Sequence, residues 1–239
     1  MRIIQPDWPA PPSVHAFCSS RIGGHSKPPF DSLNLSDAVG DDEHLVRINR
    51  EQLANFSGMP QLPQWFPQVH GANIVAADAP HQEADGTIAR SRGQVCAVLT
   101  ADCLPVLLCE PSATQVAAVH AGWRGLAVGI LCKAVRLLAV ESTSLMVWLG
   151  PAIGPQAFEV GVEVYQKFIA LNNDYGAAFQ SYGEKYLANI YQIARIQLAQ
   201  VGVERVYGGQ YCTYQQQTLF YSYRRAAQTG RMGSFIWLD

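Results

Sequence analysis

The sequence has little charge, no strongly basic stretch and no long apolar run. Charged residues make up 15% of the 239 residues, and the formal net charge is −2. Such a chain has no positive field to attract a nucleic-acid backbone, so a nucleic acid is not expected as a partner. Residues 1–9 lack the apolar run of a signal peptide, and no apolar stretch reaches membrane-spanning length. We therefore expect a cytoplasmic protein that does not bind membranes.

Several common cysteine and histidine patterns are also missing. The six cysteines include no CxxC pair, so neither a disulfide framework nor a redox motif is expected. The sequence has no HExxH pair and no HxE with a following PCxxC, which excludes the usual zinc protease and nucleobase deaminase signatures. Cys96, Cys109 and Cys132 lie in apolar runs, where a reduced thiol behaves as a small hydrophobic side chain.

Hydrophobic residues are abundant, at 49% of the chain, which predicts extensive buried surface. No repeat or low-complexity linker divides the sequence, so we expect residues 1–239 to form one α/β unit with mixed sheets. Apolar periodicity and turn residues place the elements. The predicted helices cover 41–56, 125–140, 159–171 and 186–201, and the predicted strands cover 13–18, 94–100, 105–109, 115–121, 145–149, 204–211, 218–223 and 234–238.

Three short segments each present one soft metal ligand. His70 lies before a glycine in a loop, Cys103 follows a predicted strand, and His120 lies near the end of another. A zinc ion held by three protein ligands keeps a fourth position open, whereas a structural zinc is usually closed by four. The intervals of 33 and 17 residues between these ligands match no finger or ribbon site. The set favours a catalytic metal site.

Two other interpretations of these residues stay open. Cys103 can be the nucleophile of a metal-free hydrolase, with His120 as base and Asp102 or Asn73 orienting that base. Alternatively, a fourth ligand such as Cys18, or one from another chain, completes a non-catalytic metal site. The sequence does not distinguish a thiolate that binds zinc from one that attacks carbon.

At the same three segments the chain resembles the YfiH family, described as multicopper polyphenol oxidoreductase or laccase-domain proteins. The resemblance covers nearly the whole length. The motifs that also carry it are SRIGGHS at 20–26, LNL at 33–35, VGDD at 39–42, GPAIG at 150–154, FYSYRR at 220–225 and TGR at 229–231.

The resemblance implies a mixed α+β fold, layered as a sandwich of mixed sheets flanked by helices. It also implies a zinc site formed by His70, Cys103 and His120, with Cu²⁺ as the alternative ion. Members are credited with phosphorolysis of adenosine, inosine, guanosine and methylthioadenosine and with adenosine deamination, so purine nucleoside and phosphate become the expected partners. Other members are credited with copper-dependent phenol oxidation or with hydrolysis of peptidoglycan precursors.

The number of histidines bears on the oxidase alternative. A multicopper oxidase of the usual kind needs a large set of histidines, mostly in His-x-His pairs, whereas this chain has six histidines and no such pair. Cu²⁺ can still displace zinc from a Cys/His site because of its generally higher affinity. Weak oxidase activity would therefore not reveal the native role.

The phosphorolysis hypothesis requires an anion pocket and groups that bind the nucleoside. Arginine presents a planar fork suited to phosphate, and the candidates are Arg21 and Arg124, with Arg224 a weaker third. Asp102, next to the thiolate, is expected either to exchange protons or to orient His70 or His120. Gln68 and Asn34 are candidates for hydrogen bonds to the ribose or base, and Phe30 or Trp123 for stacking on the purine.

Overall fold

Two β-sheets stacked face to face form the centre of the computed structural model, which describes residues 1–239. The smaller of these is antiparallel and has the strand order β1-β2-β13-β5. Its four strands come from the two ends and the middle of the sequence. The bounds are β1 Ile3–Ile4, β2 Val14–Ser19, β13 Met232–Leu238 and β5 Val95–Thr100.

The larger sheet has six strands in the order β12-β8-β6-β7-β4-β3. Its two edge pairs, β12 with β8 and β3 with β4, are parallel, and the remaining pairs are antiparallel. The bounds are β12 Arg205–Gly208, β8 Met146–Leu149, β6 Leu104–Cys109, β7 Val116–Ala121, β4 Gly86–Ala89 and β3 Ile74–Ala76.

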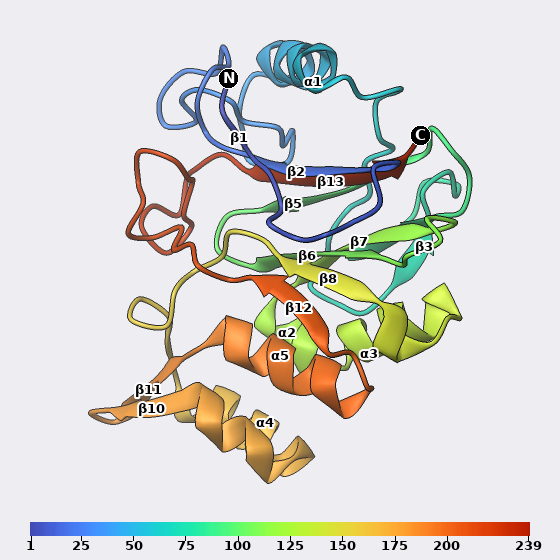
Figure 1. Cartoon of the computed structure of the whole chain (residues 1–239). Coiled ribbons are helices and arrows are strands. Elements are labelled where there is room, and N and C mark those ends of the chain that lie inside the picture. Colours follow the sequence, from blue (N-terminus) through green and yellow to red (C-terminus); the bar gives the residue numbers. More distant parts are fainter.

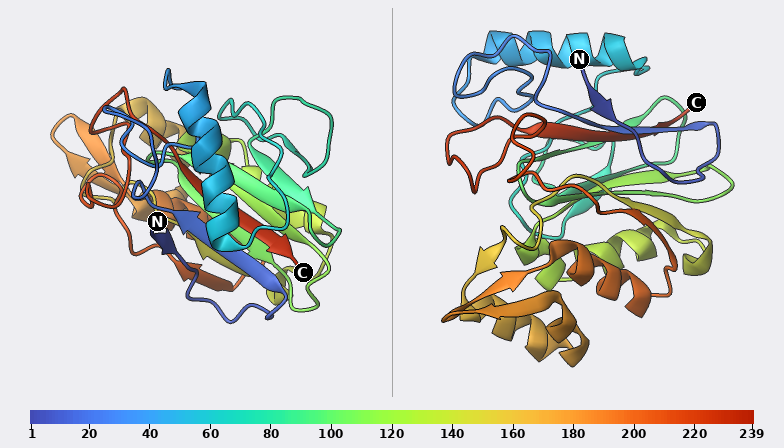
Figure 2. Two further views of the ribbon diagram at one scale, coloured as in Figure 1. Left: turned by 90° about the horizontal axis from the view of Figure 1, so that it is seen from above. Right: turned by 60° about the vertical axis from the view of Figure 1, so that its left-hand side comes forward.

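Helices cover the outer faces of both sheets (Figure 1). Helix α1, Glu43–Ser57, lies across the smaller sheet, and its N-terminus is capped by the Asp42 side chain. Helices α2, Trp123–Ala127, α3, Ile130–Leu138, and α5, Ile190–Gln200, cover the larger sheet. The second view of Figure 2 shows the same layers from another side. The fold is thus the mixed α+β sandwich that the resemblance implies.

A small lobe projects beyond helix α5 (Figure 1). It consists of helix α4, Val162–Leu171, and a three-stranded sheet in the order β10-β11-β9. The strands are β9 Glu159–Val160, β10 Phe179–Tyr182 and β11 Lys185–Ala188. Two 3₁₀ turns complete the elements, η1 at Ser142–Ser144 and η2 at Asn173–Ala178.

The hydrophobic core has three parts that match these layers. The largest cluster, of 33 buried residues, lies between the larger sheet and its helices and includes Leu104, Val119 and Ile130. A cluster of 18 fills the space between the two sheets, and one of 8 lies beneath α1. Strand β7 contributes Ala117 and Val119 to the first cluster and Val116 and Ala118 to the second, which is the alternation expected of a strand buried on both faces.

Several predicted elements differ from the structure. The helix predicted at 125–140 is two helices, because Gly129 adopts a left-handed conformation with φ of 80° after α2 ends. The predicted strand at 218–223 is wrong, since this segment consists of turns. The first residues of the helices predicted at 159–171 and 186–201 belong to strands β9 and β11. The prediction also missed β1, β3, β4 and β10.

No helix is both long enough and apolar enough to cross a membrane.

Candidate metal centre

The register of the larger sheet brings two of the three predicted metal ligands to the same end of its central strands. Leu104 pairs with Ala121 in the antiparallel β6–β7 hairpin, so Cys103, just before β6, lies beside the end of β7 that carries His120. His70 reaches the same place from the loop that leads to β3. This loop residue has a positive φ of 60°. This arrangement agrees with the prediction that three segments distant in sequence form one cluster.

The three ligand atoms form a compact group. The imidazole nitrogens of His70 and His120 and the Sγ atom of Cys103 all lie within 4.8 Å of one another. The two imidazole rings are nearly perpendicular, at 79° with centroids 4.8 Å apart. His120 is buried and His70 is exposed, so the cluster has an open side. One thiolate and two imidazoles are donors that zinc accepts, and the open side fits a fourth, exchangeable position.

Asp85 supports two of these ligands, although no sequence motif pointed to it. Its Oδ1 atom accepts a hydrogen bond from His120 Nδ1 at 2.8 Å and one from the backbone N–H of His70 at 2.9 Å. Its Oδ2 atom accepts from the N–H of Gly71 at 2.7 Å. Because a carboxylate only accepts, His120 must carry a proton on Nδ1, which leaves Nε2 free to bind a metal.

The same sheet register explains the position of Asp85. Gly86, the first residue of β4, pairs with Val119, so Asp85 lies opposite His120, whose backbone N–H donates to the Asp85 carbonyl at 2.7 Å. The only signal in the sequence was an aspartate directly before a short apolar segment, and strand β4 was not predicted. Without the strand pairing, Asp85 could not be connected to His120.

Cys103 and His120 shift each other's pKa values in opposite directions. Burial raises the pKa of the Cys103 thiol, but the charges and hydrogen bonds of His120 and His70 outweigh burial and lower it from 9.0 to about 6. Burial lowers the pKa of His120, whereas Cys103 and Asp85 raise it to about 9. The site therefore stabilises a thiolate, which is the form of cysteine that binds metals and attacks carbon.

Asp102 has a different position from the one we expected. Its Oδ1 accepts from the Thr213 hydroxyl at 2.6 Å and its Oδ2 from the backbone N–H of Arg224 at 2.7 Å. No hydrogen bond joins it to His70 or His120. Asp102 instead connects the β5–β6 turn, where its own φ is 104°, to the irregular segment 209–231. We expected Asp102 or Asn73 to orient His120, but the carboxylate that contacts its ring is that of Asp85, and Asn73 donates to the Glu83 carbonyl.

Gly122 leaves room for the cluster. A Cβ atom at this position would lie 3.1 Å from Cys103 Sγ and 3.3 Å from His70 Cδ2. Both distances are shorter than ordinary van der Waals contacts. The glycine that ends the β7 segment thus allows the backbone to approach two ligands closely.

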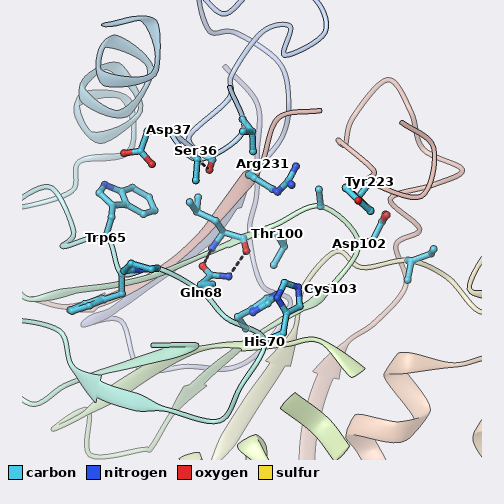
Figure 3. A pocket seen from close by; sticks show the side chains of 18 of the residues that line it. Ser36, Asp37, Trp65, Gln68, His70, Thr100, Asp102, Cys103, Tyr223 and Arg231 are labelled. Carbon is cyan, nitrogen blue, oxygen red and sulfur yellow. Dashed lines mark hydrogen bonds between the residues drawn. The ribbon is translucent and has the colours of Figure 1, made fainter. Parts of the chain in front are cut away.

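The metal ligands form part of the wall of a cavity of about 680 Å³. This volume lies in the range of small-molecule binding sites. Trp65, Phe66 and Trp123 contribute aromatic surface, and Asp37, Arg50, Thr100, Tyr223, Arg224 and Arg231 contribute polar groups. Figure 3 shows ten labelled residues around this space, with His70 and Cys103 on one side and Arg231 on the other.

The structure places some of the predicted substrate residues outside this lining. The guanidinium of Arg21 donates to the Asp31 carbonyl and carboxylate, at 2.7 and 3.1 Å from Nη2. Arg124 is exposed and lies over the Trp123 ring, at 4.5 Å from its centroid. Asn34 is buried and donates to Ser36 and Asp41, and Phe30 is buried as well.

Other candidates do line the cavity. Gln68 is held at both ends, because its amide donates to the Leu99 carbonyl at 2.8 Å and accepts from the Leu99 N–H at 2.7 Å. Trp123 and Arg224 lie in the wall, and Arg224 donates to the Glu159 carbonyl. Thr100 and Arg231 also line the cavity and were not among the predicted site residues.

The remaining histidines do not join the cluster. His15 contacts Asp239, His25 contacts Gln52, and His44 contacts Arg47, while His81 lies elsewhere on the cavity wall. His70, Cys103 and His120 form the only group of three or more potential metal donors in the chain. This arrangement provides for one ion rather than for a multicopper centre.

Comparison with known proteins agrees with the fold and the motifs. Residues 15–239 match the family model described as multi-copper polyphenol oxidoreductase laccase. "Purine nucleoside phosphorylase YfiH" of Escherichia coli (strain K12) is 50% identical over 240 residues, covering 99% of both chains. "Purine nucleoside phosphorylase PA4543" of Pseudomonas aeruginosa is 47% identical, covering 99% of this chain and 98% of that protein.

A solved structure gives the same result. The crystal structure of Neisseria meningitidis protein NMB0706 superposes with a TM-score of 0.95 at 41% identity and covers all of both chains. Identity at this level over full length leaves no doubt about common descent. The chain belongs to the YfiH family, the group matched by the multi-copper polyphenol oxidoreductase laccase model.

Proposed function

We propose that the chain is a zinc-dependent purine nucleoside phosphorylase that acts on adenosine, inosine, guanosine and methylthioadenosine and also deaminates adenosine. The observation that carries the proposal is the three-donor cluster of His70, Cys103 and His120 on the wall of a cavity of about 680 Å³. The names of relatives at 50% and 47% identity support the choice of substrate class.

The proposed reaction exchanges one bond for another. An oxygen of inorganic phosphate forms a bond to the anomeric carbon of the ribose while the bond from that carbon to the purine nitrogen breaks. The electron pair of the broken bond goes to the purine, which takes up a proton and leaves as the free base. The second product is ribose 1-phosphate, or 5-methylthioribose 1-phosphate when the substrate is methylthioadenosine.

Residues of this chain suit the purine of a nucleoside on one part of the cavity wall and a metal ion on another. Trp65, Phe66 and Trp123 offer flat apolar surface for a purine, and such stacking adds to the gain from buried area. Asp85 holds His120 in one tautomer and fixes the His70 loop, so two ligands keep their orientation without substrate. When bound to the cluster, zinc supplies a Lewis acid at the cavity wall.

The test combines zinc content with turnover in matched variants. Purified protein loaded with zinc is given inosine with and without phosphate, and the free base and ribose 1-phosphate are measured by chromatography. We expect base release that depends on phosphate. His70→Ala should lose both zinc and turnover, whereas His44→Ala, on the exposed face of α1, should keep both. Absence of base release from every purine nucleoside by zinc-loaded protein, or equal zinc in His70→Ala, contradicts the proposal.

A second candidate function is a cysteine hydrolase that acts on peptidoglycan precursors. Asp85, His120 and Cys103 follow one another in contact, with Asp85 Oδ1 2.8 Å from His120 Nδ1, and the Cys103 pKa is lowered to about 6. In a cysteine hydrolase, Asp85 would orient the base, His120 would be the base and Cys103 would be the nucleophile. A covalent adduct on Cys103, formed with a peptidoglycan precursor in metal-depleted protein and detected by mass spectrometry, would favour it. Metal-dependent turnover without an adduct favours the phosphorylase.

A further inference from the structure

Arg231 is the one half-buried arginine of the cavity lining that forms no ion pair. Of the three arginines in the lining, Arg50 pairs with Asp37, with 3.3 Å between Nη1 and Oδ2. Arg224 is exposed, and its Nη2 donates to a backbone carbonyl. Arg231 is half-buried and forms no ion pair. Its Nη1 donates to the carbonyls of Thr229 and Gly230, at 2.8 and 3.1 Å, while Nε and Nη2 have no partner in the protein.

Thr100 provides an independent observation at the same place. Its side chain is 2% exposed, and its Oγ1 atom is buried without a hydrogen-bond partner. A buried hydroxyl in this state costs free energy, because it has lost its hydrogen bonds to water and gained none. Since Thr100 lines the cavity, a bound ligand can supply the missing partner.

Strand pairing explains why these two residues are neighbours. Thr100 is the last residue of β5 and pairs with Met232, the first residue of β13. Arg231 directly precedes Met232, so the pair forms where the smaller sheet ends at the cavity. In the view of Figure 3, Thr100 lies between Arg231 and Cys103. The Arg231 guanidinium therefore lies across the cavity from the metal ligands, with the unpaired Thr100 hydroxyl between them.

The charges around Arg231 leave its positive charge available. Burial lowers the pKa of Arg231 and has the largest effect, whereas Cys103, Asp102 and Tyr223 raise that pKa. The Asp102 oxygens already accept from Thr213 and from the Arg224 backbone. The Asp37 carboxylate accepts from Arg50. Neither Asp102 nor Asp37 forms an ion pair with Arg231, so the Arg231 guanidinium can accept an anionic ligand in the cavity.

We propose that Arg231 and Thr100 form the subsite for the inorganic phosphate consumed in the reaction. The guanidinium fork presents two donors that suit two phosphate oxygens, and the Thr100 hydroxyl donates to a third or to a shared one. This inference rests on the proposed phosphorylase function. It differs from the sequence prediction, which named Arg21, Arg124 and Arg224 for this role.

Two variants test the subsite, and Thr100→Val is the more specific one because it removes only a hydroxyl group. Valine has nearly the same shape but no hydroxyl, and since Oγ1 has no protein partner, the melting temperature should not fall. A purely structural threonine would leave phosphate binding unchanged. We expect a rise in the KM for phosphate of about 10-fold, the lower end of the value of one hydrogen bond to a charged acceptor.

Arg231→Gln should have the larger effect. Loss of a charged pair of hydrogen bonds is expected to raise the KM for phosphate about 10- to 100-fold. The KM for inosine should change much less in both variants. Arg136→Gln, an exposed position on α3, is the matched control and should behave as the unaltered protein. Binding of inorganic phosphate to the zinc-loaded proteins is measured in parallel by titration calorimetry.

The outcomes separate this inference from the proposed function. Base release that continues in both variants with unchanged phosphate KM and affinity overturns the subsite and leaves the phosphorylase intact. Phosphate binding that is weakened by both changes, in a protein that releases no base, supports the subsite and rejects the phosphorylase. Binding of inosine 5′-monophosphate through Arg231 and Thr100, with no binding of inorganic phosphate, overturns the assignment to phosphate itself.

Discussion

At the scale of single residues, Asp85 is the group on which the geometry of the metal cluster most depends. Its side chain is fully buried and accepts from His120 Nδ1 and from the backbone N–H groups of His70 and Gly71. One carboxylate therefore fixes both the tautomer of one ligand and the loop that carries another. Groups that orient metal-binding histidines in this way commonly change metal affinity when they are replaced.

Asp85→Asn should weaken zinc binding about 10- to 100-fold, because the asparagine NH₂ group would face N–H donors that now meet a carboxylate oxygen. Competition with a chromophoric chelator gives the dissociation constant. Circular dichroism checks that the variant is folded. Asp7→Asn, at an exposed position, is the control. Equal zinc affinity in the Asp85 and Asp7 variants would show that the hydrogen bond to His120 does not support the metal.

Residue types and short motifs were enough to predict His70, Cys103 and His120 as neighbours, because each lies next to a turn beside an apolar strand. They were not enough for Asp85, Thr100 or Arg231. The role of these residues comes from strand pairing between segments distant in sequence, such as Thr100 with Met232. Arg21 and Asn34 belong to motifs on which the resemblance rests, yet the structure gives them contacts outside the cavity lining.

At the scale of elements, the β6–β7 hairpin carries Cys103 before its first strand and His120 in its second. Its turn is closed by Glu110, whose carboxylate accepts from the N–H and hydroxyl groups of Ser112 and Thr114. The hairpin pairs from Leu104 with Ala121 to Cys109 with Val116. The turn is thus at the far end of the hairpin from the metal ligands, and it affects stability without touching the site.

Glu110→Gln should lower the free energy of unfolding at neutral pH by about 1 kcal/mol, since charged hydrogen bonds are replaced by weaker ones. Burial raises the pKa of Glu110, but the four hydrogen bonds outweigh it, so the folded-state pKa lies below the ordinary 4.5. The contribution of the carboxylate is therefore complete above about pH 4.5 and is lost as the pH falls through the lower folded-state value. Urea unfolding at several pH values should show the difference between the two proteins shrinking only in acid. A difference that is constant with pH would contradict this account.

Strongly periodic elements such as α1, β5, β6 and β7 could be predicted because burial of one face or both determines their sequence. The short strands β3, β4 and β9 to β11 could not. Each has two to four residues, so local sequence carries little pattern, and pairing partners rather than propensity place them. The break between α2 and α3 depends on one left-handed glycine inside an otherwise helical apolar pattern.

At the scale of the whole molecule, three apolar clusters hold the layers together independently of the metal ligands. His70, Cys103 and His120 belong to none of these clusters. A zinc ion at the cavity wall would thus stabilise a fold that already exists, unlike the zinc of a small finger domain. This property distinguishes a catalytic metal site from a structural one.

Removal of zinc by a chelator should therefore leave the far-ultraviolet circular dichroism spectrum unchanged and lower the melting temperature by a moderate amount. For free zinc at about 100 times its dissociation constant the expected loss is about 2.7 kcal/mol, or roughly 5 to 10 °C for a chain of this size. His44→Ala should show the same decrease, and His70→Ala should show none. Unfolding on chelation would identify the site as structural and would support a closed, non-catalytic metal centre.

Asp102 joins two parts of the cavity wall that differ in how firmly the fold holds them. The metal ligands are fixed by the register of a six-stranded sheet, where a change in one strand disturbs its neighbours. Tyr223 and Arg224, by contrast, lie in an irregular segment that Asp102 holds through Thr213 and one backbone N–H. Substitutions and insertions in that segment alter the cavity wall without moving the sheet. Changes in this segment can thus alter which substrate the cavity accepts while the metal ligands stay in place.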